Sequence, residues 1–500
     1  MIYNTETGVL EGAISLPLCA RTVNCDVNED ISVPEEFPEV RRFLAIRENI
    51  LAPAKFIGAR SVDFSGAVDY TLIYLGADGK INSMPFSAEY SFSLPVENAD
   101  RVDLGEGVSV LCALSGDGSS VRVNTPRRLQ LRAGIKASVL CFGRGLCEEN
   151  LRGVEDSSAL QRLRLDSKCL AINCESSDVV TLADEYFIGE DCRILYSDAS
   201  CAINDSTVDG EVAKVSGEVC VRLMLEKGDS VEQVMRKMPF EAQTDIEELD
   251  GGEDTLLCSA VGSINELNVA AAAGRAEIEV ALVLSVCIAR NSDVCYTRDI
   301  YSTAQICSAE YKKMRLPYLI ANKNATLTQS ERVACESIGL ERDLEIVDVW
   351  GSASCESCSL ENGRYALRGK VRYKLLCKGD SDIRVYDAEL PFKYESGSGT
   401  LDVSSFCAHA ELLGARARSD GENVLLESEL AMAIAFFGEN ELEMLSSADF
   451  GEPVKLEKNQ MVVCFKSSDE ELFEIGKRYC VPIEDISADD SGSRFVIIER

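Results

Sequence analysis

Alternation of apolar and polar residues is the main pattern along most of the chain. Residues 68–72, VDYTL, are one example, in which every second side chain is hydrophobic. Because successive side chains of a strand point to opposite faces of a sheet, this period places one face on a core and the other in water. Asp209-Gly210 and Asn362-Gly363 stand where tight turns would join such strands into hairpins. The pattern therefore predicts a mainly β protein with antiparallel sheets.

One strand segment occurs three times at a nearly constant spacing. The copies are FSGAVDYTLIY (64–74), VSGEVCVRLML (215–225) and LRGKVRYKLLC (367–377). Their glycines, Gly66, Gly217 and Gly369, are 151 and 152 residues apart. Self-similarity at a fixed period is typical of proteins built from repeated structural units. We therefore predict three β-sandwich-like modules, in which each glycine marks a bulge or a close approach of the backbone.

A proline–phenylalanine pair and a second apolar strand follow each copy. The pairs occupy 85–86, 239–240 and 391–392, and the strands occupy 129–142, 276–289 and 424–437. Proline has no N–H to donate to a sheet, so it marks the start or the edge of a strand. Phe86, Phe240 and Phe392 are predicted to fill the cores of the modules.

These repeats predict how the chain is divided into domains. A single core rarely exceeds about 250–300 residues, so a chain of 500 residues should contain several. The predicted parts are a first module with an N-terminal segment (1–145), a charged and partly helical linker (146–165), a second module (166–291), a connector with one strand (292–330), a third module (331–457) and a small C-terminal domain (458–500). Trp350, the only tryptophan, should lie on a strand of the third module with one side buried.

The C-terminal domain begins with a helical pattern. Leu472, Ile475 and Tyr479 recur at the spacing of one helix face. Ser468 and Glu471 have the spacing of a capping box, in which each side chain bonds a backbone N–H at the start of the helix.

A second short helix should begin at Pro482 and carry Ile483 and Ile486. Apolar strands at 462–465 and 495–498 flank the two helices. The predicted order of this domain is therefore βααβ.

The charge of the chain excludes some partners. Lysine and arginine number 50 against 84 aspartate and glutamate residues, a formal net charge of −34. The electrostatic field of so negative a protein repels nucleic acid and anionic lipid. No apolar run reaches the roughly 18 residues that a membrane span needs. The N-terminus, MIYNTETGVLEG, has no basic start followed by an apolar stretch, so we expect no secretory signal and a cytoplasmic protein.

The 21 cysteines are predicted to be reduced core residues. Cys141 and Cys287, for example, lie inside apolar runs, where a free thiol behaves as a small hydrophobe. Only Cys355 and Cys358 have the spacing of metal ligands, and no second pair or histidine follows nearby. A structural zinc site needs four ligands, so we expect no metal.

Catalytic residues are not evident. His409 is the only histidine, and a lone histidine on a strand is more often a packing residue than a base. The stretch 363–370 has five residues between its glycines and is no phosphate loop, and the acidic stretch 247–254 lacks the spacing of a calcium loop. No carboxylate pair recurs across the three copies, which argues against a hydrolase. We expect a protein that is not an enzyme and binds no cofactor.

Several motifs resemble a known family. SVPEEFPEVRRFLAIRENI (32–50) and DIYSTAQ (299–305), with the glycine, strand and Pro-Phe core, resemble the SPOCS domain of spore-coat proteins in endospore-forming Firmicutes. LFEIGKRYCVPIEDI (472–486) is similar to the helical signature of LysM domains. Three SPOCS-like repeats before a degenerate LysM domain resemble the SipL-type spore-coat morphogenetic proteins.

This resemblance implies a function in sporulation. It implies a spore-coat assembly scaffold in the mother-cell cytoplasm, at the forespore surface. The LysM-like domain would dock on a SpoIVA-like coat ATPase, with other coat proteins as further partners.

Two loops depart from the LysM pattern. Asp469, Glu470 and Glu471 replace the usual Gly-Asp-Thr, and SADDSG (487–492) lacks the usual asparagine. In LysM domains that bind carbohydrate these loops line the N-acetylglucosamine groove, and acidic side chains there disfavour glycan binding. The alternative function is that of a peptidoglycan- or chitin-binding cell-wall protein that uses the same segment.

The predicted protein-binding residues are Phe473, Lys477, Arg478 and Ile483. Phe473 occupies the position of a tryptophan common in LysM domains and lies opposite Ile475 on the helix. An aromatic residue among basic ones is a suitable interface anchor. The core of the domain should consist of Leu472, Ile475, Tyr479, Val481 and Ile486.

Overall fold

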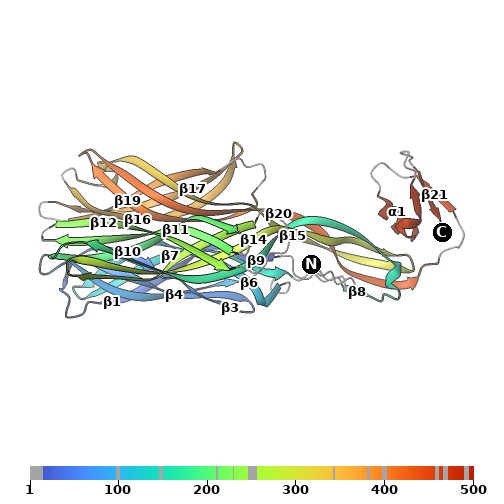
Figure 1. Ribbon diagram of the computed structural model, residues 1–500, viewed down its shortest axis with the longest axis horizontal. Helices are drawn as coiled ribbons and strands as arrows, with labels where there is room; N and C mark the ends of the chain where they lie inside the picture. Colours follow the sequence, from blue (N-terminus) through green and yellow to red (C-terminus); the bar gives the residue numbers. More distant parts are fainter. Residues whose placement is uncertain are drawn as a thin grey trace.

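The computed structural model describes residues 15–96, 102–145, 150–209, 212–228, 230–245, 256–341, 344–379, 383–396, 403–455, 461–465, 471–488 and 495–499. Nearly all of these residues lie in strands, and α1 (Leu472–Tyr479) is the one α-helix among them. The mainly β prediction is confirmed. Figure 1 shows a broad body of strands, a narrower stalk and a small domain at the far end of the stalk.

The first third of the body, here called unit 1, consists of two sheets. One has the order β1-β7-β6, and in the other β4 lies between β2 and both β3 and β5. The strands are β1 (Ser15–Ser32), β2 (Val40–Ile50), β3 (Ala54–Ile57), β4 (Ser61–Gly76), β5 (Ile81–Pro95), β6 (Val102–Thr125) and β7 (Arg128–Gly145). Apolar side chains from both sheets, such as Tyr70 and Leu131, form one core.

Unit 2 has the same arrangement of strands. Its sheets have the orders β13-β14-β9 and β10-β11-β12. The strands are β9 (Leu160–Phe187), β10 (Cys192–Asp209), β11 (Val212–Lys227), β12 (Ser230–Asp245), β13 (Leu256–Ala272) and β14 (Arg275–Ser302). Val221 of one sheet and Leu282 of the other belong to one buried core.

Unit 3 repeats the order once more, as β15-β20-β19 and β16-β17-β18. The strands are β15 (Gln305–Ala334), β16 (Glu345–Glu361), β17 (Arg364–Lys378), β18 (Ile383–Ser396), β19 (Ser405–Ser419) and β20 (Asn423–Pro453). Asn362 and Gly363 have positive φ and form the predicted tight turn between β16 and β17. Trp350 lies on a strand of this unit, β16, as the sequence predicts, but it is 7% exposed and thus buried as a whole rather than on one side.

The three spaced glycines all lie on the middle strand of a sheet. Gly217 is opposite Phe240 and Gly369 is opposite Phe392, and a Cβ at either glycine would overlap the facing ring. A register shift in the neighbouring strand lies beside each of these two glycines. The predicted close approach is therefore confirmed, and the bulge lies on the partner strand.

The first copy differs in its aromatic residue. Gly66 is opposite Tyr90, whereas Phe86 is opposite Tyr70 and is only half-buried. Pro85 lies 19 residues after Gly66, and the equivalent distance is 22 residues in the other two copies. The predicted equivalence of Phe86 with Phe240 and Phe392 is therefore wrong, because the shorter connection shifts its register.

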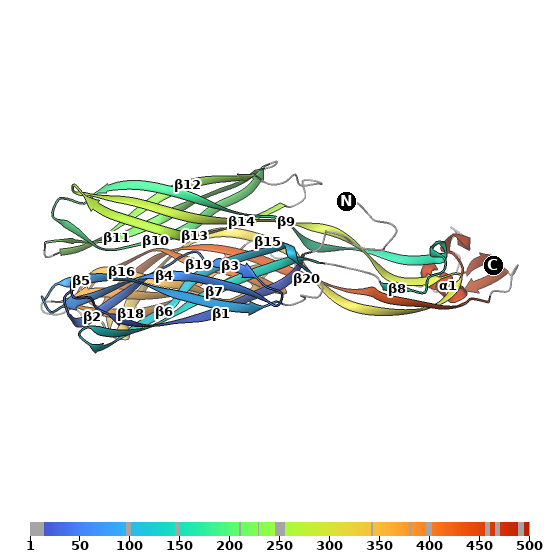
Figure 2. The same cartoon turned by 90° about the horizontal axis from the view of Figure 1, so that it is seen from below.

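The stalk is formed by the ends of the longest strands (Figures 1 and 2). β14 pairs with β9 as far as Ser302 and Leu160, and β15 pairs with β20 from Gln305 and Pro453. The predicted connector at 292–330 therefore lies in β14 and β15. The predicted linker at 146–165, where described, contains β8 (Asn150–Arg152), a short 3₁₀ turn (Ser157–Ala159) and the start of β9.

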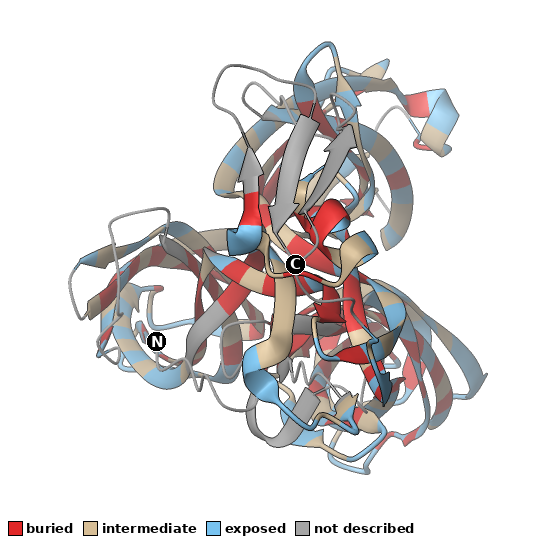
Figure 3. Cartoon of the chain, turned by 90° about the vertical axis from the view of Figure 1, so that its right-hand side faces the viewer, coloured by how far each residue is buried: buried red, intermediate tan, exposed pale blue. Residues whose placement is uncertain are grey.

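The three units pack around a common centre (Figure 3). One buried cluster draws on all of them, with Leu44 and Ile73 from unit 1, Met224 from unit 2 and Leu376 from unit 3. Burial of apolar surface between units favours one rigid body. Within the described ranges no helix is long and apolar enough to span a membrane.

The C-terminal domain contains one α-helix rather than two. Its elements are β21 (Met461–Phe465), α1, a 3₁₀ turn (Ile483–Asp485), β22 (Ile486–Ala488) and β23 (Phe495–Glu499), with the sheet order β21-β23-β22. The predicted βααβ order is wrong, because only three residues separate Pro482 from the strand that begins at Ile486. So short a segment closes a 3₁₀ turn but not an α-helix.

The start of α1 also differs from the prediction. Glu471 occupies the N-cap position without a side-chain hydrogen bond, and the helix begins at Leu472. Ser468, the predicted cap, lies outside the described residues.

Seventeen cysteines of the described ranges are present without a disulfide. Cys141 and Cys377 are fully buried, and Cys287 is nearly so. Burial raises the pKa of the Cys377 thiol to about 12, which keeps it protonated. No cluster of three or more metal-ligating side chains occurs among the residues described.

Candidate functional site

The C-terminal domain has a small core of its own. Ile475, Val481 and Ile486 are buried together, and Leu472 and Tyr479 pack against them. The predicted core residues are therefore confirmed. Cys480 adopts the left-handed conformation and ends α1, so that the chain turns back across the helix.

Phe473 lies outside this core, on another face of α1. It is nevertheless only 3% exposed, because its ring meets the ring of Tyr301 on β14. The ring centroids are 5.0 Å apart and the planes are inclined by 71°, an edge-to-face contact. The residue predicted to anchor a partner thus contacts the tip of the stalk of its own chain.

Lys477 lies one turn after Phe473 and faces the same part of the stalk. Its Nζ donates to Asp299 Oδ1 at 2.8 Å and to Oδ2 at 2.5 Å. The hydroxyl of Tyr311 on β15 also donates to Asp299. Burial alone would lower the pKa of Lys477, but the hydrogen bond and the charge of Asp299 outweigh it and raise the pKa. Burial and Asp299 raise the pKa of Tyr311.

Gly476 allows the two surfaces to approach closely. The hydroxyl of Tyr301 donates to the carbonyl oxygen of Val481 at 2.8 Å. A Cβ at Gly476 would overlap the Tyr301 hydroxyl, so any larger residue would separate the helix from β14.

The structure brings together two of the four predicted site residues. Phe473 and Lys477 form the contact with the stalk tip, whereas Arg478 is exposed and Ile483 is half-buried beyond the end of the helix. The residues that complete the contact are Asp299, Tyr301 and Tyr311, which sequence reasoning did not identify. Two of them lie in the segment 299–305, but nothing in the sequence links it to a helix 170 residues later.

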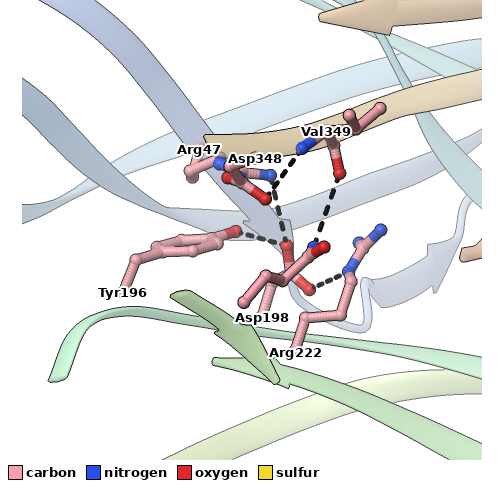
Figure 4. Close-up of polar contacts among 7 residues, drawn as sticks. Arg47, Tyr196, Asp198, Arg222, Asp348 and Val349 are labelled. Carbon is pink, nitrogen blue, oxygen red and sulfur yellow. Dashed lines mark hydrogen bonds and ion pairs between the residues drawn. The ribbon is translucent and has the colours of Figure 1, made fainter. Parts of the chain in front are cut away.

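A second polar cluster lies at the centre of the body (Figure 4). The guanidinium of Arg47 on β2 donates to Asp348 on β16, and one of its nitrogens lies 3.9 Å from Asp198 on β10. Asp198 also accepts from Arg222 Nε at 2.5 Å and from the Tyr196 hydroxyl at 2.9 Å. Two arginines and two aspartates from three units thus balance each other's charge.

Aromatic rings enclose the centre of this cluster. The Arg47 guanidinium lies 3.8 Å from the centroid of the Trp350 ring and 4.9 Å from that of Tyr196. This stacking is favourable for a desolvated arginine. The cluster therefore joins units 1, 2 and 3 through one side chain.

A cavity of about 160 Å³ adjoins the cluster and is lined by all three units. Ser200 faces it with a buried hydroxyl that has no protein partner, so the cavity is suited to ordered water. Burial raises the pKa of Glu48 to about 7; the charge of Lys374 lowers this pKa and that of Asp117 raises it. His409 also lines the cavity, 3.5 Å from Glu411, together with Ser200 and Cys201.

Comparisons with known proteins return no match. No family model matches the chain, and neither a curated protein nor a solved structure does so. A function must therefore be inferred from the residues and contacts described above and from the resemblance of the motifs.

Proposed function

We propose that the protein is a non-enzymatic spore-coat assembly scaffold. Its LysM-like C-terminal domain docks on a SpoIVA-like coat ATPase at the forespore surface, on the mother-cell side. Three repeated β-sandwich-like modules carry that domain and offer surface to other coat proteins. Neither a cofactor nor a metal takes part.

The division of α1 into two faces is the main observation in favour of this function. Ile475 belongs to the small core of the domain, whereas Phe473 and Lys477 point away from it and contact the tip of the stalk of the same chain. Aromatic residues are enriched at protein interfaces and often contribute much of the binding energy. The helix is therefore suited to docking on protein.

The recurring strand order supports the modular part of the proposal. In each unit a first long strand pairs with the last one, and the second, third and fourth main strands form the other sheet. The middle strand of that second sheet carries Gly66, Gly217 or Gly369 at its closest approach to an aromatic ring. One module used three times accounts for this recurrence.

Glycan binding is the alternative to be separated from docking. Asp469, Glu470 and residues 489–492, which would line a sugar groove, lie outside the described residues. The acidic sequence of these loops, rather than their geometry, is what favours a protein partner.

The test measures binding of the full chain to a purified SpoIVA-like ATPase. A chain truncated after Lys458 should lose binding. Phe473→Ala should weaken it by about 1–3 kcal/mol while circular dichroism shows that the domain stays folded. Glu474→Ala is the matched control, because Glu474 is the exposed neighbour on the same helix.

Two results would overturn the proposal. Equal binding by the full chain and the truncated chain would place the docking surface outside the LysM-like domain. Binding of N-acetylglucosamine oligomers at micromolar concentration, without binding to the ATPase, would favour the cell-wall function instead.

A further inference from the structure

The face of α1 proposed for docking is already covered by the tip of the stalk. Phe473 meets the ring of Tyr301, and Lys477 pairs with Asp299. Phe473 is only 3% exposed, so it cannot keep this contact and contact a partner protein at the same time. Docking through this face therefore requires the helix to leave the stalk.

The contact joins two separate hydrophobic clusters. Among the residues that the structure describes, the cluster of the C-terminal domain contains no residue of the stalk. Within the same ranges, the cluster of the stalk tip, which includes Ile300, Leu445 and Phe450, contains no residue of the C-terminal domain. Separation would break one aromatic contact, one ion pair and the hydrogen bond from Tyr301 to Val481, but would leave both hydrophobic clusters intact.

The ion pair is also partly accessible to water. The Lys477 side chain is 38% exposed and that of Asp299 is 13% exposed. Asp299 is buried beneath the helix, and water reaches both charges once the helix leaves the stalk, so the open state leaves no unpaired charge buried. The contact is thus of the kind that opens and closes reversibly.

We infer that Phe473 and Lys477 on α1 and Asp299 and Tyr301 on β14 form a latch that a docking partner must open. This inference rests on the proposed function. The stalk tip presents a carboxylate beside a tyrosine ring, and the partner surface that replaces it should offer the same chemistry, an acidic side chain next to an aromatic one. The apparent affinity for the partner is the intrinsic affinity reduced by the fraction of chains that are open.

The first experiment tests the latch without any partner. Asp299→Asn and Tyr301→Phe are introduced together into the full chain, because they remove the ion pair and the hydrogen bond to Val481 but keep the shape of the side chains. Hydrogen exchange of residues 472–479 should become at least about fivefold faster than in the wild type. Exchange in the body should not change.

Lys313→Gln is the matched control for this variant. Lys313 lies on the same stalk and pairs with Glu441 at 3.0 Å, and neither residue is among the contacts of α1. Unchanged exchange of 472–479 in the double variant, or an equal increase in the control, would overturn the latch.

The second experiment measures the affinity of the same chains for a purified SpoIVA-like ATPase. The double variant should bind about fivefold more tightly or better, in the usual range of coupling between two equilibria. Weaker binding would mean that the stalk tip is part of the docking surface, and equal binding would mean that the latch does not cover it; either overturns the inference. If no chain binds the ATPase, the proposed function fails, and the exchange experiment still decides whether the latch exists.

Discussion

The centre of the body and the tip of the stalk use the same combination of side chains in different surroundings. At the centre, Arg47 pairs with Asp348 between aromatic rings, and the two side chains are 3% and 1% exposed. At the tip, Lys477 pairs with Asp299 beside tyrosines, and the exposed fractions are 38% and 13%. Both pairs join segments that are far apart in the sequence.

The degree of burial determines whether each of these ion pairs can open. A buried ion that loses its partner cannot be hydrated, so the central cluster holds the three units in one arrangement. A partly exposed ion that loses its partner is hydrated at once, so the pair at the tip can open. An ion pair beside aromatic rings therefore holds the three units together at the centre, whereas a similar pair at the stalk tip forms a contact that can open.

Removal of the central cation should have the largest effect. Arg47→Ala leaves Asp348 and Asp198 buried without their full charge balance and should destabilise the body by about 3–5 kcal/mol. The midpoint of urea unfolding, followed by circular dichroism, measures this. Arg275→Ala is the control, because it breaks an exposed pair with Glu185 and should cost no more than about 1 kcal/mol. Equal effects of the two changes would contradict the importance of burial.

The pH dependence of the body should show the protonation of Glu48. Its pKa is raised from 4.5 to about 7 in the folded chain, so the folded state binds its proton more tightly than the unfolded state does. The stabilisation that the protonated Glu48 gives to the folded state is fully present below about pH 4.5 and is lost as the pH rises through about 7. Glu48→Gln stays neutral, so the difference in unfolding free energy between the two chains should change by on the order of 2–3 kcal/mol over this interval. A difference in unfolding free energy that does not change with pH would show that Glu48 is not desolvated.

Two glycine substitutions compare a close approach inside the body with the one at the stalk tip. At Gly369 a Cβ would meet the backbone oxygen of Ser354 and the Phe392 ring, so Gly369→Ala should lower the stability of the body by about 1–3 kcal/mol. At Gly476 a Cβ would overlap the tip of the Tyr301 side chain, so Gly476→Ala should release the helix without unfolding the domain. Urea unfolding and hydrogen exchange of 472–479 distinguish these outcomes. If residues 472–479 of Gly476→Ala exchanged as fast as an unfolded chain, the domain would have unfolded, and the expectation for Gly476 would be wrong.

The smallest effect on stability is expected at the tip. Lys477→Gln should change the unfolding free energy of the full chain by less than about 1 kcal/mol, because the site is partly hydrated. Thermal melting of the wild type and the variant measures this. A decrease as large as that of Arg47→Ala would mean that the contact is a structural junction.

Local patterns predicted local structure well. The spacing of Leu472, Ile475 and Tyr479 was sufficient to identify the core of the C-terminal domain, since one helical turn brings these side chains together. The strands that carry Gly217 and Gly369 and their facing rings were found in the same way. The prediction failed where a connection changed length, as at Phe86, because a shift in register exchanges one aromatic residue for another.

The candidate site was predicted only in part. Phe473 and Lys477 were identified because Phe473 lies opposite Ile475 on the helix and is an aromatic residue among basic ones. Asp299, Tyr301 and Tyr311 could not be identified, because their relation to that helix depends on where the long strands β14 and β15 end.

The sequence by itself determined the β-rich class, the threefold recurrence of a strand segment and the helix near the C-terminus, since each depends on periods of a few residues or on direct repetition. Only the tertiary structure decided that Arg47, Asp198 and Asp348 meet at one centre and that the docking face of α1 lies against the stalk. These contacts join residues between about 150 and 300 positions apart. Such pairs are set by the packing of whole sheets, and no local pattern of hydrophobic and polar residues encodes which sheets will meet.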